Sequence, residues 1–256
     1  MYIRMLIFLL SVSEKAEFLN SKYNHNRFSF ATFGSLTSNN NILFITEQNL
    51  HSRVILNCSN FCRKDRRCIG MEVCRIKEEL FRCRACCSWM ITNKQQFISA
   101  DNCKYLKKEE GFFRNIAVNK PVTMSSVFNP TETNHREFNA VNNVTICSGG
   151  TYTAHSNSEH MPWIKIDLQS EYDVQRVVIF NRQDRFGERL NNLLITVGNT
   201  GTENFCGYFG KTASTADQIL IYCEDGTVGR YVMATIFSNP GKLDILNICE
   251  FQVFVK

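Results

Sequence analysis

The sequence predicts a mainly β protein, in which a jelly-roll β-sandwich is preceded by a small disulfide-rich α+β module. Two observations lead to this fold class. Eight of the twelve cysteines are crowded between Cys58 and Cys103, whereas the other four are spread through the second half. The second half also contains many short apolar segments separated by turn-forming residues, which is typical of sandwiches and barrels. A chain of 256 residues has room for two modest domains.

The N-terminus predicts a signal peptide over residues 1–13. Met5 to Val12 form a short apolar run, and Ser11-Val12-Ser13 supplies the small residues needed for cleavage after Ser13. A buried first strand is the alternative. Cleavage would make the protein secreted, and the sequons at Asn57 and Asn143 agree with an extracellular glycoprotein.

Residues 14–110 are expected to form the cysteine-rich module. Phe28-Ser-Phe and Ile42-Leu-Phe-Ile indicate short strands, and Cys58 to Ile76 is expected to form a helix, because Cys58 and Cys62 lie one turn apart. A module of this size buries little apolar surface, so disulfides are expected to stabilise it. Eight cysteines allow about 105 pairings, and the connectivity stays open.

The sequence disfavours two other interpretations of this module. Zinc at Cys83-x-x-Cys86-Cys87 is disfavoured, because no histidine is near in the sequence and an oxidising compartment pairs thiols. Residues 58–110 carry twelve Lys/Arg against seven Asp/Glu. A solvated positive face is favoured here over a site for anionic glycans or membranes.

The spacing Cys58-x3-Cys62-x5-Cys68, followed by Ile69-Gly-Met-Glu-Val-Cys74, resembles that of PAN/apple-like modules. In those modules, disulfides attach a helix to a small sheet. The resemblance implies an interaction module for proteins or glycans.

Residues 111–256 are expected to form an all-β domain. Ile164, Ile166 and Leu168 alternate with more polar positions, which is the period of a strand with one buried face. No long amphipathic pattern interrupts the series, and about 145 residues suffice for an eight-stranded jelly roll. The expected strands are 163–168, 174–180, 193–197, 219–223, 231–236 and 248–255.

A histidine and three charged residues form the candidate binding constellation. His155 is followed after 26 residues by Arg182, and then by Asp184 and Arg189. The last three lie at or beyond the end of an expected strand, where rim loops usually carry binding groups. A guanidinium donates to adjacent oxygens as a rigid fork, and a carboxylate can hold it in place. Taken alone, the pattern also fits a surface salt bridge.

The sequence around this constellation resembles the F-type lectin (fucolectin) family over residues 112–256. The family's sugar motif is a histidine, an Arg-x-Asp and a second basic residue, and all four positions are filled here. The resemblance implies a discoidin-like jelly-roll lectin for L-fucose or fucosylated glycans, with a role in innate recognition or adhesion. The other matching segments are Asn115-Ile-Ala-Val-Asn-Lys-Pro121, Pro162-Trp163-Ile-Lys-Ile-Asp-Leu168, Asn204-Phe-Cys206-Gly207, Gly229-Arg230-Tyr231-Val232 and Cys249-Glu250-Phe-Gln-Val.

The resemblance assigns roles to the four motif residues. His155, Arg182 and Arg189 would hydrogen-bond the hydroxyls and ring oxygen of fucose, and Asp184 would orient the arginines. The axial 4-hydroxyl is the expected discriminator, because a site built to pair a hydroxyl rejects sugars that misplace it.

The chain departs from the family directly after the motif aspartate. Some members have two adjacent cysteines there, whose disulfide packs on the sugar, whereas this chain has Arg185 and Phe186. The ring of Phe186 is expected to replace that apolar contact, and Arg185 to add a donor or shift the sugar preference. Tyr152 is expected to contribute to the apolar wall, because it is close to His155 in the sequence.

The resemblance also implies a structural calcium ion and two disulfides. Calcium prefers six to eight oxygen ligands, including carboxylates, but the family's Asp-Gly-Asn turn reads Asn142-Asn143-Val144 here. Binding by Asn139, Asn142 and Glu250 is therefore left open. The implied disulfides are Cys206–Cys223 and Cys147–Cys249.

Other function classes are disfavoured. The chain lacks a Gly-x-Ser-x-Gly elbow, a His-Glu-x-x-His helix and a phosphate loop, so it is not expected to be an enzyme. It has no nucleic-acid-binding motif and no later segment of membrane-helix length. A discoidin-like protein- or membrane-interaction module with a degenerate sugar site is the alternative function. A homo-oligomer would strengthen weak single sugar sites through multivalency.

Overall fold

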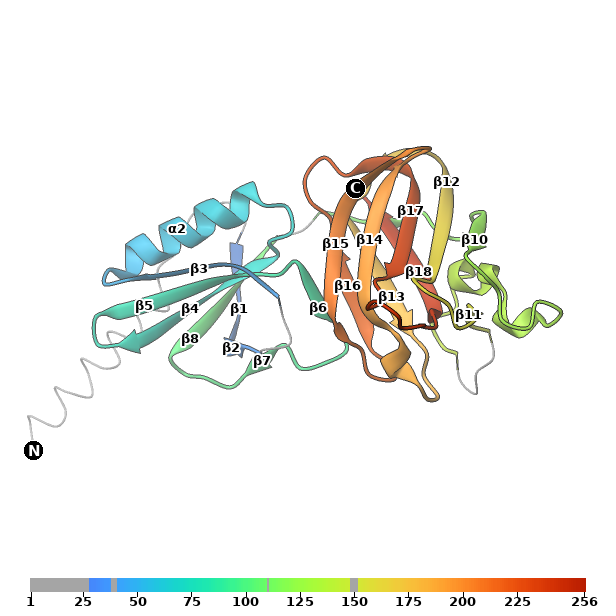
Figure 1. Cartoon of the computed structure of the whole chain (residues 1–256). Helices are drawn as coiled ribbons and strands as arrows, with labels where there is room; N and C mark the ends of the chain where they lie inside the picture. Colours follow the sequence, from blue (N-terminus) through green and yellow to red (C-terminus); the bar gives the residue numbers. More distant parts are fainter. Residues whose placement is uncertain (1–27, 38–40, 110, 148–151) are drawn as a thin grey trace, which may run out of the picture.

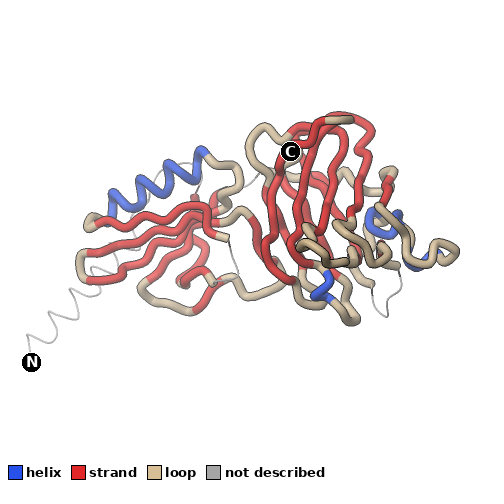
Figure 2. The backbone as a smooth tube through the Cα atoms, viewed as in Figure 1, coloured by secondary structure: helices blue, strands red, loops and turns tan. Residues whose placement is uncertain are grey.

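The computed structural model describes residues 28–37, 41–109, 111–147 and 152–256. Within them, two β-rich lobes lie next to each other, and the only long helix belongs to the first lobe (Figures 1 and 2). No helix of the described residues combines the length and apolar character that a bilayer span requires. The expected signal peptide over residues 1–13 lies outside the described residues.

The first lobe is an antiparallel sheet of strand order β1-β8-β4-β5-β3, with helix α2 (His51–Lys64) across one face (Figure 1). Val54 and Ile55 of the helix are buried against Met71 and Val73 of the sheet. The strands expected at Phe28 and Ile42 are confirmed. The strand bounds are β1 Phe28–Phe33, β3 Ile42–Gln48, β4 Gly70–Lys77, β5 Leu80–Cys86 and β8 Cys103–Lys108, with a separate pair of β2 Ser35–Leu36 and β7 Phe97–Ile98.

The helix expected over 58–76 is wrong in its bounds. It begins earlier, at His51, and ends at Lys64, where Asp65 takes an extended backbone and accepts the backbone N–H of Arg67 at 2.9 Å. Residues from Gly70 onward form β4 instead. A Cβ at position 70 would meet the Tyr105 hydroxyl at 2.2 Å, so the close approach of β4 and β8 requires glycine there.

Disulfides fasten the helix and strands of the first lobe. Cys58–Cys83 joins α2 to β5, Cys62–Cys68 closes the turn after α2, and Cys74–Cys103 joins β4 to β8. The adjacent Cys86 and Cys87 are paired with each other. No cysteine of the described residues is free, so the zinc alternative at Cys83, Cys86 and Cys87 has no thiolate ligands.

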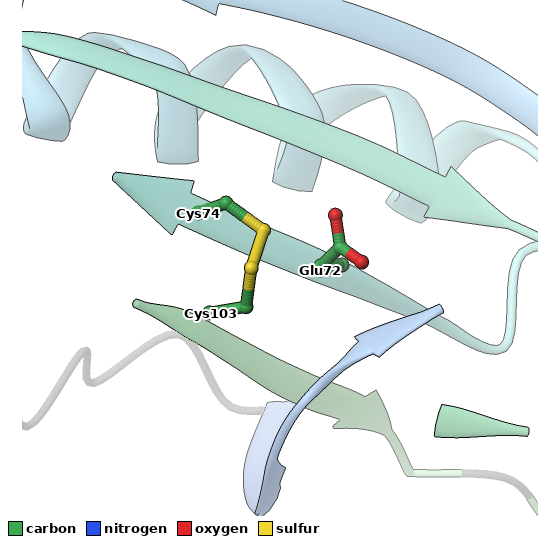
Figure 3. A group of neighbouring side chains, drawn as sticks. All are labelled: Glu72, Cys74 and Cys103. Carbon is green, nitrogen blue, oxygen red and sulfur yellow. A yellow bond between two sulfur atoms is a disulfide. The ribbon is translucent and has the colours of Figure 1, made fainter. Parts of the chain in front are cut away.

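Figure 3 shows Glu72 beside the Cys74–Cys103 disulfide, a grouping that has the residue types of a metal site. The two sulfur atoms are bonded to each other, and Glu72 accepts a hydrogen bond from Arg84 Nε at 2.8 Å. The group is therefore a structural ion pair next to a disulfide.

The second lobe is a sandwich of two antiparallel sheets, with strand orders β10-β12-β17-β14-β15 and β11-β18-β13-β16-β6. Ile164 and Ile195 of the first sheet and Ile179 and Phe251 of the second are fully buried between them. The expected discoidin-like β-sandwich is confirmed. The bounds are β9 Arg114–Asn115, β10 Val122–Met124, β11 Ala154–His155, β12 Trp163–Asp173, β13 Arg176–Asn181, β14 Asn191–Asn199, β15 Thr202–Thr212, β16 Gln218–Tyr222, β17 Val228–Ile236 and β18 Asn247–Val255, with 3-10 helices η1 Thr133–His135, η2 Glu137–Val141 and η3 Gly187–Arg189.

Both disulfides implied for this lobe, Cys147–Cys249 and Cys206–Cys223, are present. Each expected strand also appears. The long strand β15 was missed, because most of its residues are exposed and give no alternating apolar pattern.

One strand from the first part of the sequence joins a sheet of the second lobe. β6 (Trp89–Ile91) belongs to the cysteine-rich part of the sequence, yet it pairs with β16 and forms the edge of the second sheet. Trp89 is 5% exposed, and its ring meets Phe209 edge-on at 4.8 Å. The boundary near residue 110 stays a prediction, but the core of the second lobe includes side chains that precede it.

Candidate functional site

The four motif residues gather at one end of the second lobe. His155 lies on β11 and Arg182 directly follows β13, while β18 pairs with both strands. Arg189 lies on η3, in the same loop as Asp184. Residues from two distant parts of the sequence therefore meet at the rim of one sheet.

Arg182 and Asp184 form a bidentate ion pair. Nε and Nη2 of Arg182 each donate to one carboxylate oxygen of Asp184 at 2.7 Å. Hydrogen bonds from Arg182 lower the pKa of Asp184 to about 2, so the carboxylate is charged at neutral pH. Because Nε and Nη2 of Arg182 both donate to Asp184, Nη1 is not used by this ion pair and can donate to a ligand.

His155 is held as a neutral acceptor. Its Nδ1 lies 2.7 Å from the carbonyl oxygen of Ser156, which fixes the proton on Nδ1, and its Nε2 lies 3.4 Å from Nη1 of Arg189. Burial, aided by the charges of His135, Arg189 and Arg182, lowers the pKa of His155 to about 4. At physiological pH the site therefore presents two cationic donors beside one imidazole acceptor.

Phe186 brings an aromatic face to this cluster. Its ring centroid lies 4.5 Å from the guanidinium of Arg189, 5.1 Å from that of Arg185 and 5.7 Å from that of Arg182. The ring is 41% exposed, and the residue has a left-handed φ of 59°. A non-glycine residue in this region is strained, and such strain is common at ligand sites.

Two aromatic residues of the site were missed by sequence reasoning. The ring of Phe128 lies 4.9 Å from that of His155, and the ring of His135 lies 5.3 Å from both. Phe128 is 46% exposed, so it offers a second apolar face beside the imidazole. Neither residue belongs to the motif, and their position before β11 gives no pattern that would single them out.

Asn181 was also not predicted from the sequence. It does not belong to the motif, but its side chain bonds the backbone of the loop that carries the motif residues. Its Nδ2 donates to the carbonyl oxygens of Gly187 and Ser214, and its Oδ1 accepts the backbone N–H of Arg182 at 2.9 Å. It is 1% exposed. This side chain fixes where the Arg182 loop leaves the sheet.

The expected role of Tyr152 in the apolar wall stays a prediction. Its side chain is 56% exposed, and the ring contacts around His155 come from Phe128 and His135. Phe128 and His135 are thus further rings near His155, and the sequence did not predict them.

Glu250 has the features of a cation ligand. It is fully buried on β18, and its Oε1 accepts the backbone N–H of Asn143 at 3.2 Å, while its Oε2 has no partner within the described residues. Burial raises the pKa of Glu250 to about 8. A buried carboxylate oxygen without a partner is costly, and a bound cation would satisfy it.

The two amides named with Glu250 are engaged locally. Asn142 Oδ1 accepts the backbone N–H of Val144 at 2.8 Å, and Asn139 Nδ2 donates to the carbonyl of Thr133 at 2.9 Å. The Asn139 bond uses its donor, so its side-chain oxygen is compatible with a cation. Neither set of bonds occupies all the lone pairs of the two side-chain oxygens, so calcium binding by Asn139 and Asn142 stays a prediction.

Comparisons with known proteins find similarity in the second lobe. Residues 128–233 match the F5/F8 type C family, described as a NedA-like galactose-binding domain. Fucolectin-1 of Anguilla japonica is 30% identical over 105 residues, covering 39% of this chain and 56% of its own length. Fucolectin of Anguilla anguilla is 31% identical over 106 residues, covering 40% and 64%. A pentraxin fusion protein of Xenopus laevis is 33% identical over 105 residues, covering 39% and 24%.

The matched part thus spans between a quarter and two thirds of these relatives. Among solved structures, a fucose binding module of Streptococcus pneumoniae has a TM-score of 0.46 at 23% identity, covering 56% of this chain and 96% of its own. An f-lectin from Morone saxatilis serum has a TM-score of 0.47 at 18% identity, covering 73% and 71%. Residues 128–233 thus match the F5/F8 type C, NedA-like galactose-binding model, and two of the relatives similar to this part of the chain are named fucolectins.

Proposed function

We propose that this protein is a secreted lectin that binds L-fucose or fucosylated glycans at the end of its second lobe. The observation that carries the proposal is the preorganised cluster of His155, Arg182, Asp184 and Arg189, in which the histidine is neutral and both guanidinium groups are held. Relatives named fucolectins supply the sugar class. A role in innate recognition or adhesion follows from that class.

Each group has a distinct task in this proposal. Nη1 of Arg182 and the guanidinium of Arg189 donate to vicinal hydroxyls and the ring oxygen. Nε2 of His155 accepts a hydrogen bond from a hydroxyl group, the axial 4-hydroxyl included, in place of its 3.4 Å contact with Nη1 of Arg189. Asp184 keeps the Arg182 fork in place. A neutral sugar has no charge to attract, so several correctly placed bonds must act together.

The apolar side of the sugar needs rings rather than donors. Phe186 is partly exposed beside the guanidinium groups, and Phe128 is partly exposed beside His155. These rings can pack against the methyl and C–H faces of a deoxyhexose. Arg185, whose guanidinium lies over Phe186, is placed to tune the preference among glycans.

The test is a glycan array with the oxidised protein, with and without free L-fucose, repeated for Arg182→Ala. We expect fucose-inhibitable binding that the substitution abolishes. Arg230→Ala is the matched control, because Arg230 forms the same bidentate fork with Asp167 on the other sheet, at 2.6 Å for both bonds. Equal losses in both variants, or no glycan binding by the unsubstituted protein, would overturn the proposal.

We also propose a structural calcium ion at Glu250, with Asn139 and Asn142 as further candidate ligands. The buried Oε2 of Glu250, which has no hydrogen-bond partner among the residues that the structure describes, supports it. Calcium should raise the Tm of the protein, and Glu250→Gln should remove this increase. A Tm that does not change with calcium concentration would leave Glu250 as a protonated core residue.

The first lobe is proposed to be an apple-like interaction module. The helix fastened to an antiparallel sheet by Cys58–Cys83 supports this assignment. The paired cysteines suit an extracellular compartment. Self-association would give the weak sugar sites avidity, and sedimentation of the protein with its disulfides intact tests that proposal.

A further inference from the structure

The segment that follows β6 connects the cysteine-rich part of the chain to the sugar-site loop. Trp89, Met90 and Ile91 pair with Ile221, Leu220 and Ile219 of β16. The chain then turns, and Thr92 donates its backbone N–H to the carbonyl of Gln218 at 2.8 Å. This pairing places the next two residues beside the segment 213–217, which precedes β16.

Asn93 bonds this segment through both ends of its amide. Its Nδ2 donates to the carbonyl oxygen of Ala216 at 2.6 Å, and its Oδ1 accepts the backbone N–H of Gln218 at 3.0 Å. Ala216 has a left-handed φ of 65°, a conformation that a non-glycine residue keeps only when its surroundings hold it. Asn93 supplies part of that hold.

Lys94 binds the same segment by charge. Its Nζ lies 2.9 Å from Oδ1 of Asp217 and 3.2 Å from the hydroxyl of Ser214. The side chain of Asp217 is 2% exposed, and Lys94 is its ion-pair partner in the described part of the chain. A buried carboxylate that loses its cation must move toward water or take up a proton.

The segment 213–217 in turn holds the site. The backbone N–H of Ala216 donates to the carbonyl of Arg182 at 2.8 Å, and that of Asn181 donates to the carbonyl of Asp217 at 2.9 Å. Asn181 also reaches back to the carbonyl of Ser214 at 2.8 Å.

The turn of Gly187 lies directly on the same backbone. Any Cβ at position 187 would meet the nitrogen of Thr215 at 2.2 Å. The loop that carries Arg182, Phe186 and Arg189 therefore rests on a segment that Asn93 and Lys94 fasten.

We propose that Asn93 and Lys94 are positioning residues of the sugar site, through which the cysteine-rich part of the chain sets the geometry of Arg182 and its loop. The effect on sugar binding rests on the proposed function, whereas the ordering of the Arg182 loop by Asn93 and Lys94 does not depend on it. Neither residue touches the motif side chains in the described contacts. They act through Ala216 and Asp217 on the backbone that carries Arg182.

Lys94→Met in the full chain is the first test, because methionine keeps the apolar stem and removes the charge. We expect the Kd for L-fucose to rise about tenfold, since a site that must be reordered loses affinity. Lys94→Arg should restore most of the affinity by re-forming the ion pair with Asp217. Lys77→Met, at an exposed position of β4, is the matched control and should leave the Kd unchanged.

Hydrogen exchange of the free protein separates this inference from the proposed function. In Lys94→Met and in Asn93→Ala, the amides of Asn181 and Ala216 should exchange faster, while amides of β4 and β5 keep their protection. Faster exchange would support the inference even if no fucose were bound. Unchanged exchange at 181 and 216, or a tenfold loss that Lys94→Arg fails to restore, would overturn it.

Discussion

Each lobe contains a carboxylate–guanidinium fork, and the two forks bury opposite partners. In the first lobe the carboxylate of Glu72 is fully buried, whereas Arg84 is 18% exposed. In the second, Arg182 is 7% exposed and its partner Asp184 is 17% exposed. Glu72 also accepts the backbone N–H of Leu36. Glu72 is thus saturated by its own lobe, whereas Arg182 retains a donor.

The surroundings of the forks differ in the same sense. Glu72 lies beside the Cys74–Cys103 disulfide, on the middle strand β4 of the first sheet (Figure 3). Arg182 lies at the rim of a sandwich beside the partly exposed ring of Phe186. A saturated buried pair contributes to the fold, whereas a held guanidinium with a remaining donor and an apolar neighbour has the features that the proposed sugar site requires.

The largest expected effect breaks the first fork. Arg84→Met leaves the buried Glu72 carboxylate without its main partner, which should lower the free energy of unfolding by about 3 to 5 kcal/mol. Urea unfolding with the disulfides intact measures this loss. Arg75→Met, at an exposed position of β4, is the control and should have little effect. Sugar affinity well below the Tm should be unchanged, and a large drop in affinity would mean that the two forks are coupled.

Breaking the second fork should lower the sugar affinity strongly and the stability only slightly. In Arg182→Lys the bidentate bond to Asp184 is lost, and the affinity for L-fucose should fall about 100-fold, because an ammonium cannot replace a rigid fork. The free energy of unfolding should change by only about 1 kcal/mol, since the partner carboxylate reaches solvent. Titration calorimetry and thermal unfolding of one preparation give both quantities. Retained affinity with a large loss of stability would make this fork structural, like that of Glu72.

The sequence predicted the motif residues and the buried strands, but it did not predict every element of the fold. His155, Arg182, Asp184 and Arg189, which the family resemblance named, do lie together, because β18 pairs with both β11 and β13 and brings their ends to one rim. Alternation of apolar residues located the well-buried strands, and it failed for β15, where most positions are exposed. Cys58 and Cys62 do lie one turn apart on α2, but the expected helix was extended too far, because Cys68 lies in the turn after α2 and Cys74 lies on β4.

The remaining residues depend on tertiary contacts that no local pattern records. Phe128 reaches His155 through the path of the chain before β11, and Asn93 and Lys94 reach the site loop only because β6 joins the second sheet. Proximity in the sequence is a weak guide in the same way. Tyr152 is three residues before His155, yet the ring contacts of His155 are with Phe128 and His135.

The pH dependence of stability should separate two buried groups of the second lobe. The pKa of His155 is lowered from 6.5 to about 4, so the unfolded chain binds more protons between those values, and stability should fall as the pH drops through this window. The pKa of Glu250 is raised from 4.5 to about 8, so the calcium-free native state binds more protons there, and stability should fall as the pH rises. The two slopes oppose each other between pH 4.5 and 6.5.

Two variants resolve the opposing slopes. Glu250→Gln should remove the fall in stability between neutral pH and pH 8, and His155→Gln should remove the fall on the acidic side. Thermal unfolding in calcium-free buffer at a series of pH values is the measurement. An unchanged alkaline slope in Glu250→Gln would show that another group carries it. Sugar binding should persist down to about pH 5 and disappear near pH 4, when His155 gains a proton and Nε2 no longer accepts.

The smallest expected effect concerns the ring that the motif does not include. Phe128→Leu keeps an apolar side chain but removes the aromatic face beside His155, whose centroid lies 4.9 Å away. Aromatic contacts of this kind contribute about 0.5 to 1.5 kcal/mol, so the affinity for L-fucose should fall a few-fold. Phe112→Leu, at a ring that is 87% exposed, is the control and should bind as before. If Phe128→Leu binds L-fucose as tightly as the unsubstituted protein does, Phe186 alone forms the apolar wall. If Phe128→Leu lowers the Tm as much as Arg84→Met does, Phe128 has a structural role.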